Sequence, residues 1–250
     1  MLNKFLNKQK QESVQFYLDF LWEMTKRELI IRYKKTYLGF LWAILNPLAQ
    51  MLIIGTVFSL FIKQDNYYLF IFIGLIFWQF YLNSTDRSSR SFIDSRNLLQ
   101  KTKFPYEIIP ISIIITNFIH LLISMGIFTI AYMIINQAFF VNLLILIPAS
   151  IWLLFLTIGV SLLTSSLNVF TRDISYLIKP LNRILFYATP IIYPLDIIPP
   201  QYHILFALNP LTMIFKLVQQ SLFNSTQIMV SFYILSISIG ILVFAAGIHL

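Results

Sequence analysis

Long apolar runs alternate with short polar segments along the whole chain. A membrane-spanning helix needs about 20 apolar residues, because lipid offers no partner for exposed backbone N–H and C=O groups. The pattern therefore predicts an all-α integral membrane protein. Six spans are predicted, of which the second and fifth are short: Tyr37–Ile62, Tyr67–Tyr81, Tyr106–Ile135, Leu143–Leu167, Leu177–Tyr193 and Ile228–Leu250.

Residues 14–31 show a different, amphipathic pattern. Val14, Tyr17, Leu18, Leu21 and Trp22 recur at helical spacing, with charged residues between them. We expect a helix that lies flat in the headgroup layer, either as a membrane anchor or as a docking surface for a cytoplasmic partner. Residues 1–36 are then a cytoplasmic N-terminus with this interface helix, and residues 37–250 form a single six-span domain.

The basic residues predict the orientation. Of the 18 Lys and Arg, eight precede the first span, five lie between the second and third spans, and two follow the fourth, which puts 15 on one set of alternate segments. Two lie on the other set, and Arg183 falls within the fifth span. Because Lys and Arg concentrate in cytoplasmic loops, both termini are predicted to be cytoplasmic. The net charge of +8 then reflects topology, and no nucleic-acid partner is expected.

Composition narrows the chemistry. The chain is 58% hydrophobic and 11% charged, it has no cysteine, and its three histidines show no metal-ligand spacing. No phosphate-binding G-x-x-x-x-G-K-[ST] loop is present, and all ten acidic residues lie in loops or at the edges of spans. A carboxylate-coupled transporter and an enzyme are therefore disfavoured. A passive channel or an externally powered pump remains.

Polar residues also recur within two spans. Asn117, His120 and Ser124 share one face of the third span, and a similar stripe in the fourth consists of Thr157, Ser161, Thr164 and Asn168. Such stripes usually make hydrogen bonds between helices. A neutral histidine without an acidic partner is a poor proton relay, so we expect a structural role for His120.

A basic cluster stands at the entrance to the first span, in the stretch "RYKKTYLGF". Arg32, Lys34 and Lys35, with Tyr33 and Tyr37, are typical of cytoplasmic charge beside an aromatic belt. The same side chains also suit a pyrophosphate group, to which Lys and Arg donate charge-assisted hydrogen bonds. Both interpretations fit the residues.

The segment between the fifth and sixth spans is interrupted by prolines at 190, 194, 199, 200 and 210. Apolar residues then recur at helical spacing from Leu211 to Leu222. A re-entrant helix or an interfacial helix fits this pattern, and irregular backbone at membrane depth must line a cavity or be buried in protein.

Four stretches, in order, resemble the permease subunits of ABC-type polysaccharide exporters, which move O-antigen, capsule or teichoic acid. They are "KRELIIRYKKTYLGFLWAILNPL", "KTKFPYEIIP", "LNVFTRDI", and "ATPIIYPLDIIP" followed by "LNPL". The resemblance implies a homodimer in the bacterial cytoplasmic (inner) membrane, with two cytoplasmic ABC ATPase subunits. It also implies a polyprenyl pyrophosphate-linked polysaccharide substrate. This chain would bind no cofactor, and ATP and Mg²⁺ would bind the partner ATPase.

The resemblance also implies roles for individual residues. The entrance for the substrate headgroup would consist of Arg32, Tyr33, Lys34, Lys35, Tyr37, Leu38 and Gly39. Contacts with the ATPase would involve Trp22, Glu23, Arg27, Arg96, Lys101, Lys103, Phe104, Pro105 and Glu107. An external gate would contain Pro190, Tyr193, Pro194, Pro199, Asn209 and Pro210.

Aromatic residues make up 16% of the chain. Because sugar rings pack their C–H faces on aromatic planes, some could guide a polymer, although membrane aromatics commonly face lipid or the helix core. The candidates are Trp42, Phe58, Phe61, Trp78, Tyr187 and Tyr193. Three alternatives to polysaccharide export remain: an ABC permease for drugs or lipids, an ATPase-independent channel, and a membrane scaffold.

Overall fold

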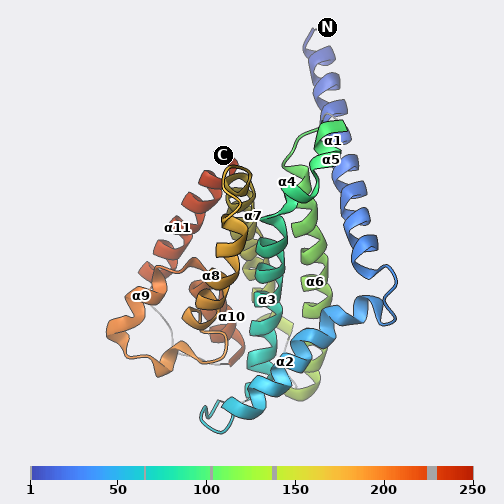
Figure 1. Cartoon of the computed structure of the whole chain (residues 1–250). Helices are drawn as coiled ribbons and strands as arrows, with labels where there is room; N and C mark the ends of the chain where they lie inside the picture. The colour runs from blue at the N-terminus through green and yellow to red at the C-terminus, as the bar shows by residue number, and fades with distance from the viewer. Residues whose placement is uncertain (1, 65, 102–103, 137–139, 224–229, 250) are drawn as a thin grey trace.

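The structure is a computed structural model that describes residues 2–64, 66–101, 104–136, 140–223 and 230–249 (Figure 1). All regular secondary structure in these ranges is helical. The long helices are α1 (Leu2–Tyr33), α2 (Trp42–Phe58), α3 (Tyr67–Ser88), α6 (Ile108–Asn136), α7 (Leu146–Phe170), α8 (Ile174–Ala188), α10 (Pro210–Phe223) and α11 (Val230–His249). The short elements are η1 (Gly39–Leu41), α4 (Ser91–Asp94), α5 (Arg96–Lys101), η2 (Phe140–Ile145), η3 (Leu195–Ile197), η4 (Pro200–Tyr202) and α9 (His203–Ala207).

Five helical segments of the described residues are long and apolar enough to cross a membrane. They are Gly39–Phe58, Tyr67–Ser88, Ile108–Ile135, Leu143–Phe170 and Val230–His249. This confirms the all-helical membrane class. The predicted fifth span corresponds to α8, which has 15 residues and ends at Ala188 rather than Tyr193. It ends there because Thr189 precedes Pro190 and has the extended backbone that this position favours (ψ 136°).

Helix α3 is the centre of the bundle. It packs against α2, α6, α7, α8 and α10, and most of its side chains are buried. Phe70, Ile71, Ile73 and Leu75 are at most 1% exposed. The apolar run therefore continues around the whole circumference of this helix, as expected for a helix surrounded by other helices.

Helices α7 and α11 approach each other closely at two glycines. A Cβ added to Gly159 on α7 would lie 2.6 Å from the Cα atom of Phe244 on α11. Gly247 on α11 faces the carbonyl of Gly159 in the same way. Small residues at such a crossing let two membrane helices approach closely. The two ends of the chain lie at the same end of the bundle (Figure 1).

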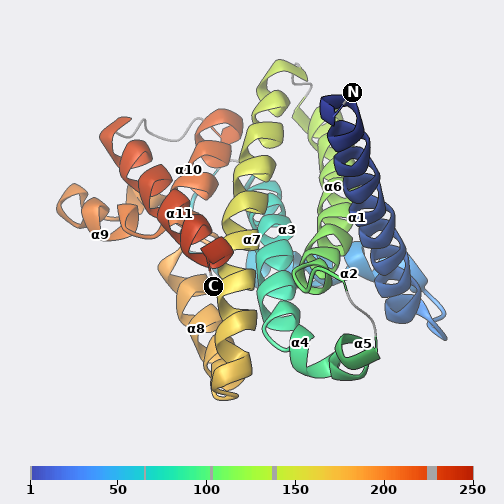
Figure 2. The same ribbon diagram turned by 90° about the horizontal axis from the view of Figure 1, so that it is seen from above.

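The amphipathic helix predicted at 14–31 is part of α1, which packs against α6. Two contacts between α1 and α6 follow one another along both helices. The Thr25 carbonyl accepts a hydrogen bond from Thr116, and Arg32 contacts His120. This part of α1 therefore lies along α6 rather than across the end of the bundle (Figures 1 and 2). The placement of this helix in the headgroup layer stays a prediction.

The apolar side of α1 is divided between two surroundings. Phe20 and Met24 pack into a small core with Phe104 and Ile108, and the Phe20 and Phe104 ring centres are 4.8 Å apart. On the adjoining side, Val14, Leu18 and Trp22 remain more than half exposed. The apolar periodicity is real, but only part of it is used for packing within this chain.

The proline-rich segment before α11 is tied down by polar contacts. Asn209 Nδ2 donates to Thr189 Oγ1 at 2.9 Å, and its Oδ1 accepts from the Leu211 N–H, which caps the start of α10. Lys216 on α10 is fully buried and donates to Asp196 Oδ1 at 2.7 Å. A buried ammonium is retained only when it is paired, so this ion pair fixes α10 against the segment that contains η3.

Candidate functional site

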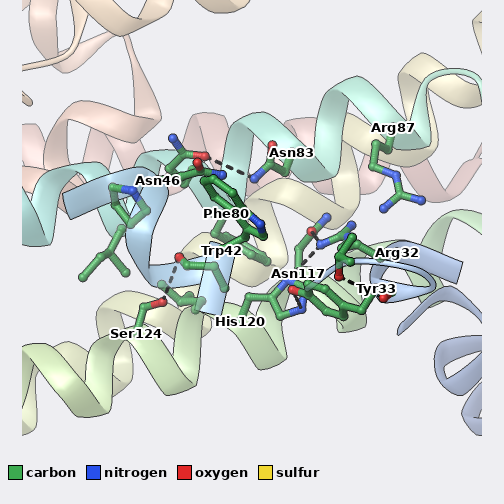
Figure 3. A pocket seen from close by; sticks show the side chains of 16 residues that line it. Arg32, Tyr33, Trp42, Asn46, Phe80, Asn83, Arg87, Asn117, His120 and Ser124 are labelled. Atoms are coloured by element: carbon green, nitrogen blue, oxygen red, sulfur yellow. Dashed lines mark hydrogen bonds between the residues drawn. The ribbon is translucent and has the colours of Figure 1, made fainter. Parts of the chain in front are cut away.

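A polar cavity of about 340 Å³ lies where the end of α1 meets α2, α3 and α6. Its walls include Arg32, Tyr33, Trp42, Asn117 and His120 (Figure 3). Further polar residues of its lining are Thr36, Asn46, Gln79, Asn83, Arg87 and Ser124. We call this space the Arg32 cavity. It brings together residues that precede the predicted first span and residues of the first and third spans.

Local sequence explains how Arg32 reaches this position. Helix α1 ends at Tyr33, where Thr36 Oγ1 donates to the Tyr33 carbonyl at 2.9 Å. The backbone then turns, with left-handed φ angles of 65° at Lys35 and 48° at Gly39. Only glycine adopts that conformation readily, which accounts for Gly39 in the turn. The chain can therefore reverse into α2 directly after presenting Arg32 and Tyr33 to α6.

The guanidinium of Arg32 is held by two residues of α6. Its Nη1 donates to Asn117 Oδ1 at 2.7 Å and to His120 Nδ1 at 2.8 Å. Asn117 is itself oriented by a 3.1 Å hydrogen bond from its Nδ2 to Ser84 Oγ on α3. The second terminal nitrogen, Arg32 Nη2, is buried and has no hydrogen-bond partner among the described residues. Buried polar groups are nearly always hydrogen-bonded, so this guanidinium nitrogen is available to donate to an acceptor on a ligand.

The arginine also decides which nitrogen of His120 carries the proton. Because an arginine N–H can only donate, Nδ1 of His120 must accept and the ring proton lies on Nε2. Nε2 is 2.8 Å from the Tyr33 hydroxyl, so it donates to that oxygen. The hydroxyl hydrogen of Tyr33 is then available to a ligand in the cavity. Arg32 and Tyr33 thus present two donors to the same space.

The electrostatics of the Arg32 cavity favour an anion. Burial, and next the nearby charge of Arg87, lower the pKa of Arg32 to about 10. The side chain therefore remains protonated at neutral pH. Arg87 is paired with Glu28, 2.8 Å away, so one of the two guanidinium charges is already balanced and that of Arg32 is not. Burial raises the pKa of Tyr33, which keeps its hydroxyl a donor.

Amide side chains extend the polar wall along α2 and α3. Gln79 Nε2 donates to Gln50 Oε1 at 3.1 Å, and Asn83 Nδ2 donates to Gln79 Oε1 at 3.3 Å. Gln50 and Asn83 are exposed in the single chain. These groups can both donate and accept, which suits hydroxyl-rich ligands as well as anions.

The predicted headgroup entrance is divided by the structure. Arg32 and Tyr33 line the cavity, whereas the side chains of Lys34, Lys35, Tyr37 and Leu38 are exposed on the turn that follows. Thr36 within that turn also lines the cavity. Lys34 and Lys35 therefore lie on a turn beside the cavity, between the lining residues Tyr33 and Thr36, but they do not line the cavity themselves.

The polar stripe on the third predicted span makes the expected contacts between helices. Asn117 and His120 bind Arg32, and Ser124 Oγ approaches the Ala43 carbonyl at 3.5 Å. Arg87, Gln79 and Asn83 were missed as site residues by sequence reasoning. Their only signal was polarity near the end of the second span. In the fourth span, Thr157 and Thr164 instead donate to carbonyls of their own helix.

The proposed polymer-guiding aromatics do not share one environment. Trp42 lines the Arg32 cavity, and Phe61 and Tyr187 are exposed by 79% and 68%. Phe58 is also exposed, and Tyr193 is half-buried with its hydroxyl donating to the Tyr187 carbonyl. Trp78 is only 4% exposed and packs against Tyr81 and Phe186. Trp78 therefore belongs to the core of the single chain, and its role as a channel aromatic stays a prediction.

Most of the residues predicted to contact an ATPase are exposed near the end of the bundle that carries α4 and α5. Trp22, Glu23, Arg27, Arg96, Lys101, Pro105 and Glu107 are all exposed. Arg96 and Glu107 line a second, largely apolar cavity of about 860 Å³. Phe104 is buried in the small core with Met24, so it supports this surface from within. Lys103 lies outside the described residues.

The residues of the predicted external gate lie in the segment around η3 and α10. Pro190 and Pro194 are buried, Pro210 at the start of α10 is half-buried, and Asn209 forms the cap described above. The Pro190 carbonyl accepts a hydrogen bond from Gln219, while Pro199 is exposed. The segment is therefore ordered by α10, which the structure buries against α3 and α7.

Comparison with known proteins adds independent information. The sequence model of the ABC-2 type transporter family matches residues 20–223. An O-antigen export system permease protein of Klebsiella pneumoniae is 32% identical over 199 residues, covering 78% of this chain and 77% of that protein. The protein of the same description from Myxococcus xanthus is 30% identical, covering 78% and 76%. The polysialic acid transport protein of Escherichia coli is 24% identical over 200 residues, covering 78% of each.

Proposed function

This chain belongs to the ABC-2 type transporter family, and from that premise we propose that it is the permease subunit of an ATP-driven exporter of lipid-linked surface polysaccharide. The relatives described as O-antigen export permeases, and the one described as a polysialic acid transporter, support a polysaccharide cargo. The cargo would be O-antigen, capsule or teichoic acid, joined to a polyprenyl pyrophosphate.

One observation supports a binding site for the pyrophosphate: Nη2 of Arg32, in the Arg32 cavity, is buried and has no partner among the described residues. A pyrophosphate offers several acceptor oxygens, and an arginine donates to such groups in a fixed planar fork. Arg32 and the Tyr33 hydroxyl would hold the anchor's pyrophosphate. Lys34 and Lys35, on the exposed turn, would attract it from the headgroup layer.

We further propose the arrangement in the membrane. The end of the bundle that carries α4, α5 and both termini would face the cytoplasm, as the Lys and Arg distribution favours. Helix α8 would complete six spans, and α10 would be a re-entrant helix on the external side. Two copies of this chain would form the path in the bacterial cytoplasmic membrane. Two ATPase subunits, which bind ATP and Mg²⁺, would dock on the surface around Trp22, Arg27 and Arg96.

Depletion of the chain in its native host tests the proposal. Lipid-linked polysaccharide should accumulate inside the cell and decline at the surface, and wild-type chain should reverse both changes. An Arg32→Gln variant that inserts normally should fail to reverse them, whereas Lys63→Gln, an exposed charge outside the cavity, should succeed. Unchanged surface polymer with no internal accumulation would refute polysaccharide export.

Two alternatives make different predictions. An ABC permease for drugs or lipids would, on depletion, retain a drug or lipid rather than a polymer. A passive channel would conduct ions in a planar bilayer without any ATPase. The Arg32 cavity favours an anionic headgroup over a hydrophobic drug, because a desolvated guanidinium would remain unpaired beside an apolar ligand.

A further inference from the structure

Helix α8 carries three distinct faces. Ser175, Ile178 and Asn182 form the face buried against the bundle. The exposed side is divided in two. One half is apolar and contains Leu177, Leu181 and Ile184. The other half contains Tyr176, Lys179, Arg183 and Tyr187, which follow one another at intervals of three or four residues and therefore lie on one side of the helix. We call these four residues the basic face of α8.

The basic face lies beside α3. The guanidinium of Arg90, just beyond the end of α3, is 5.8 Å from the centre of the Tyr176 ring. At the other end, Phe186, the neighbour of Tyr187, packs on Trp78 of α3 with ring centres 5.4 Å apart. Asn182 Nδ2 donates to Thr85 Oγ1 on α3 and fixes the rotation of α8 between these points. These contacts therefore fix the direction in which the basic face of α8 points relative to α3.

Lys179 and Arg183 are exposed and have no ion-pair or hydrogen-bond partner within the described parts of the chain. A charged side chain is costly to place in lipid, so cations in a spanning helix face water or an anion. Arg183 is nine residues from the start of α8 at Ile174, which is about 13 Å along the axis. Lys and Arg that set the topology of a membrane protein lie in its cytoplasmic loops, so topology alone does not explain an arginine this far along the helix.

The alternation of cation and tyrosine defines the ligand. Tyrosine rings pack against sugar C–H faces, and Lys and Arg pair with carboxylate or phosphate. Arg90, Lys179 and Arg183 supply cations at successive levels, so the face suits a polymer with repeated negative charges better than one pyrophosphate. We propose that the basic face of α8 binds the sugar polymer during export and that the exported polymer is anionic. This rests on the proposed polysaccharide export.

The first test identifies the polymer that accumulates when the chain is depleted in its native host. The expected polymer is retained on an anion-exchange column, and a uronic or sialic acid assay or a phosphorus assay then distinguishes carboxylate from phosphate. A neutral polymer would overturn the inference and leave the proposed function standing. No accumulated polymer would refute the proposed function first.

The second test changes the basic face. Export by a Lys179→Gln, Arg183→Gln double variant should fall about tenfold or more, because two charge-assisted contacts are lost. Exchange of the two residues, Lys179→Arg with Arg183→Lys, should retain most export at the same membrane level. Lys63→Gln serves as the charge control. Normal export of an anionic polymer by the double Gln variant would overturn the assignment to this face, and so would failure of the exchanged variant at normal membrane levels.

Discussion

Arg32 and Asn117 are 85 positions apart in the chain, yet the guanidinium of one donates to the amide oxygen of the other at 2.7 Å. This contact joins the end of α1 to the middle of α6 beside the entrance to α2. It orients an arginine whose second terminal nitrogen has no partner among the described residues. A helix expected to serve as a membrane anchor or as a docking surface thus supplies the central donor of an internal site.

His120 should contribute to stability through this contact. Its replacement in His120→Ala removes the acceptor for Arg32 and the donor to Tyr33, and leaves more of a buried guanidinium unpaired. The free energy of unfolding in detergent should fall by about 1–3 kcal/mol. His249→Ala, at an exposed position, should change it by less than about 0.5 kcal/mol. Equal effects of the two substitutions would contradict the hydrogen-bond arrangement.

Diphosphate binding should depend on pH through Arg32. The pKa of this side chain is lowered to about 10, so its charge is retained at neutral pH and lost as pH rises through that value. Affinity for a prenyl diphosphate should therefore be level near neutrality and decline as pH rises through about 10. In Arg32→Gln the affinity should be low, with no decline centred there. A wild-type profile that rises with pH would have the wrong sign.

The crossing of α7 and α11 should not tolerate a methyl group. Gly159→Ala would place a Cβ atom 2.6 Å from the Cα atom of Phe244 and force the helices apart. We expect a loss of about 2 kcal/mol in unfolding free energy. Gly126→Ala on α6 meets no atom within 4 Å and should be neutral or stabilising, because alanine favours the helix. Thermal unfolding of the two variants in the same detergent compares them directly.

The Lys216–Asp196 pair should be costly to break from one side. Asp196→Asn leaves the fully buried ammonium without its 2.7 Å carboxylate partner, and we expect a loss of about 3 kcal/mol. Adding Lys216→Met removes the stranded charge and should restore most of that loss. Asp94→Asn, at an exposed position on α4, is the control. A double variant less stable than Asp196→Asn would contradict the view that the unpaired charge of Lys216 causes the loss of stability.

The long apolar helices could be predicted from the sequence because lipid allows only a few backbone structures. The site was only partly predictable. Arg32 and Tyr33 were found through their position beside the first span, and the Asn117 and His120 stripe through its spacing. Their meeting could not be predicted, since contacts over more than 80 positions depend on how α1 packs along α6.

Two other differences have physical causes in packing. Trp78 carries an aromatic plane suited to sugars, but its position on α3 places it inside the bundle. Charge and aromatic side chains on α8 were each noted in the sequence, as Arg183 and Tyr187. Their common face emerged only once the helix start at Ile174 and its contact with α3 were known.

The most direct test of the central claim is the affinity of the purified protein for farnesyl diphosphate, measured in nanodiscs of neutral lipid. Farnesyl monophosphate serves as the comparison ligand. We predict that wild-type protein and Lys63→Gln bind the diphosphate more tightly than the monophosphate. Arg32→Gln should lose at least about tenfold in diphosphate affinity, as expected when a charged hydrogen-bond donor is removed. Equal affinities of wild type and Arg32→Gln for the diphosphate would contradict the assignment of the Arg32 cavity.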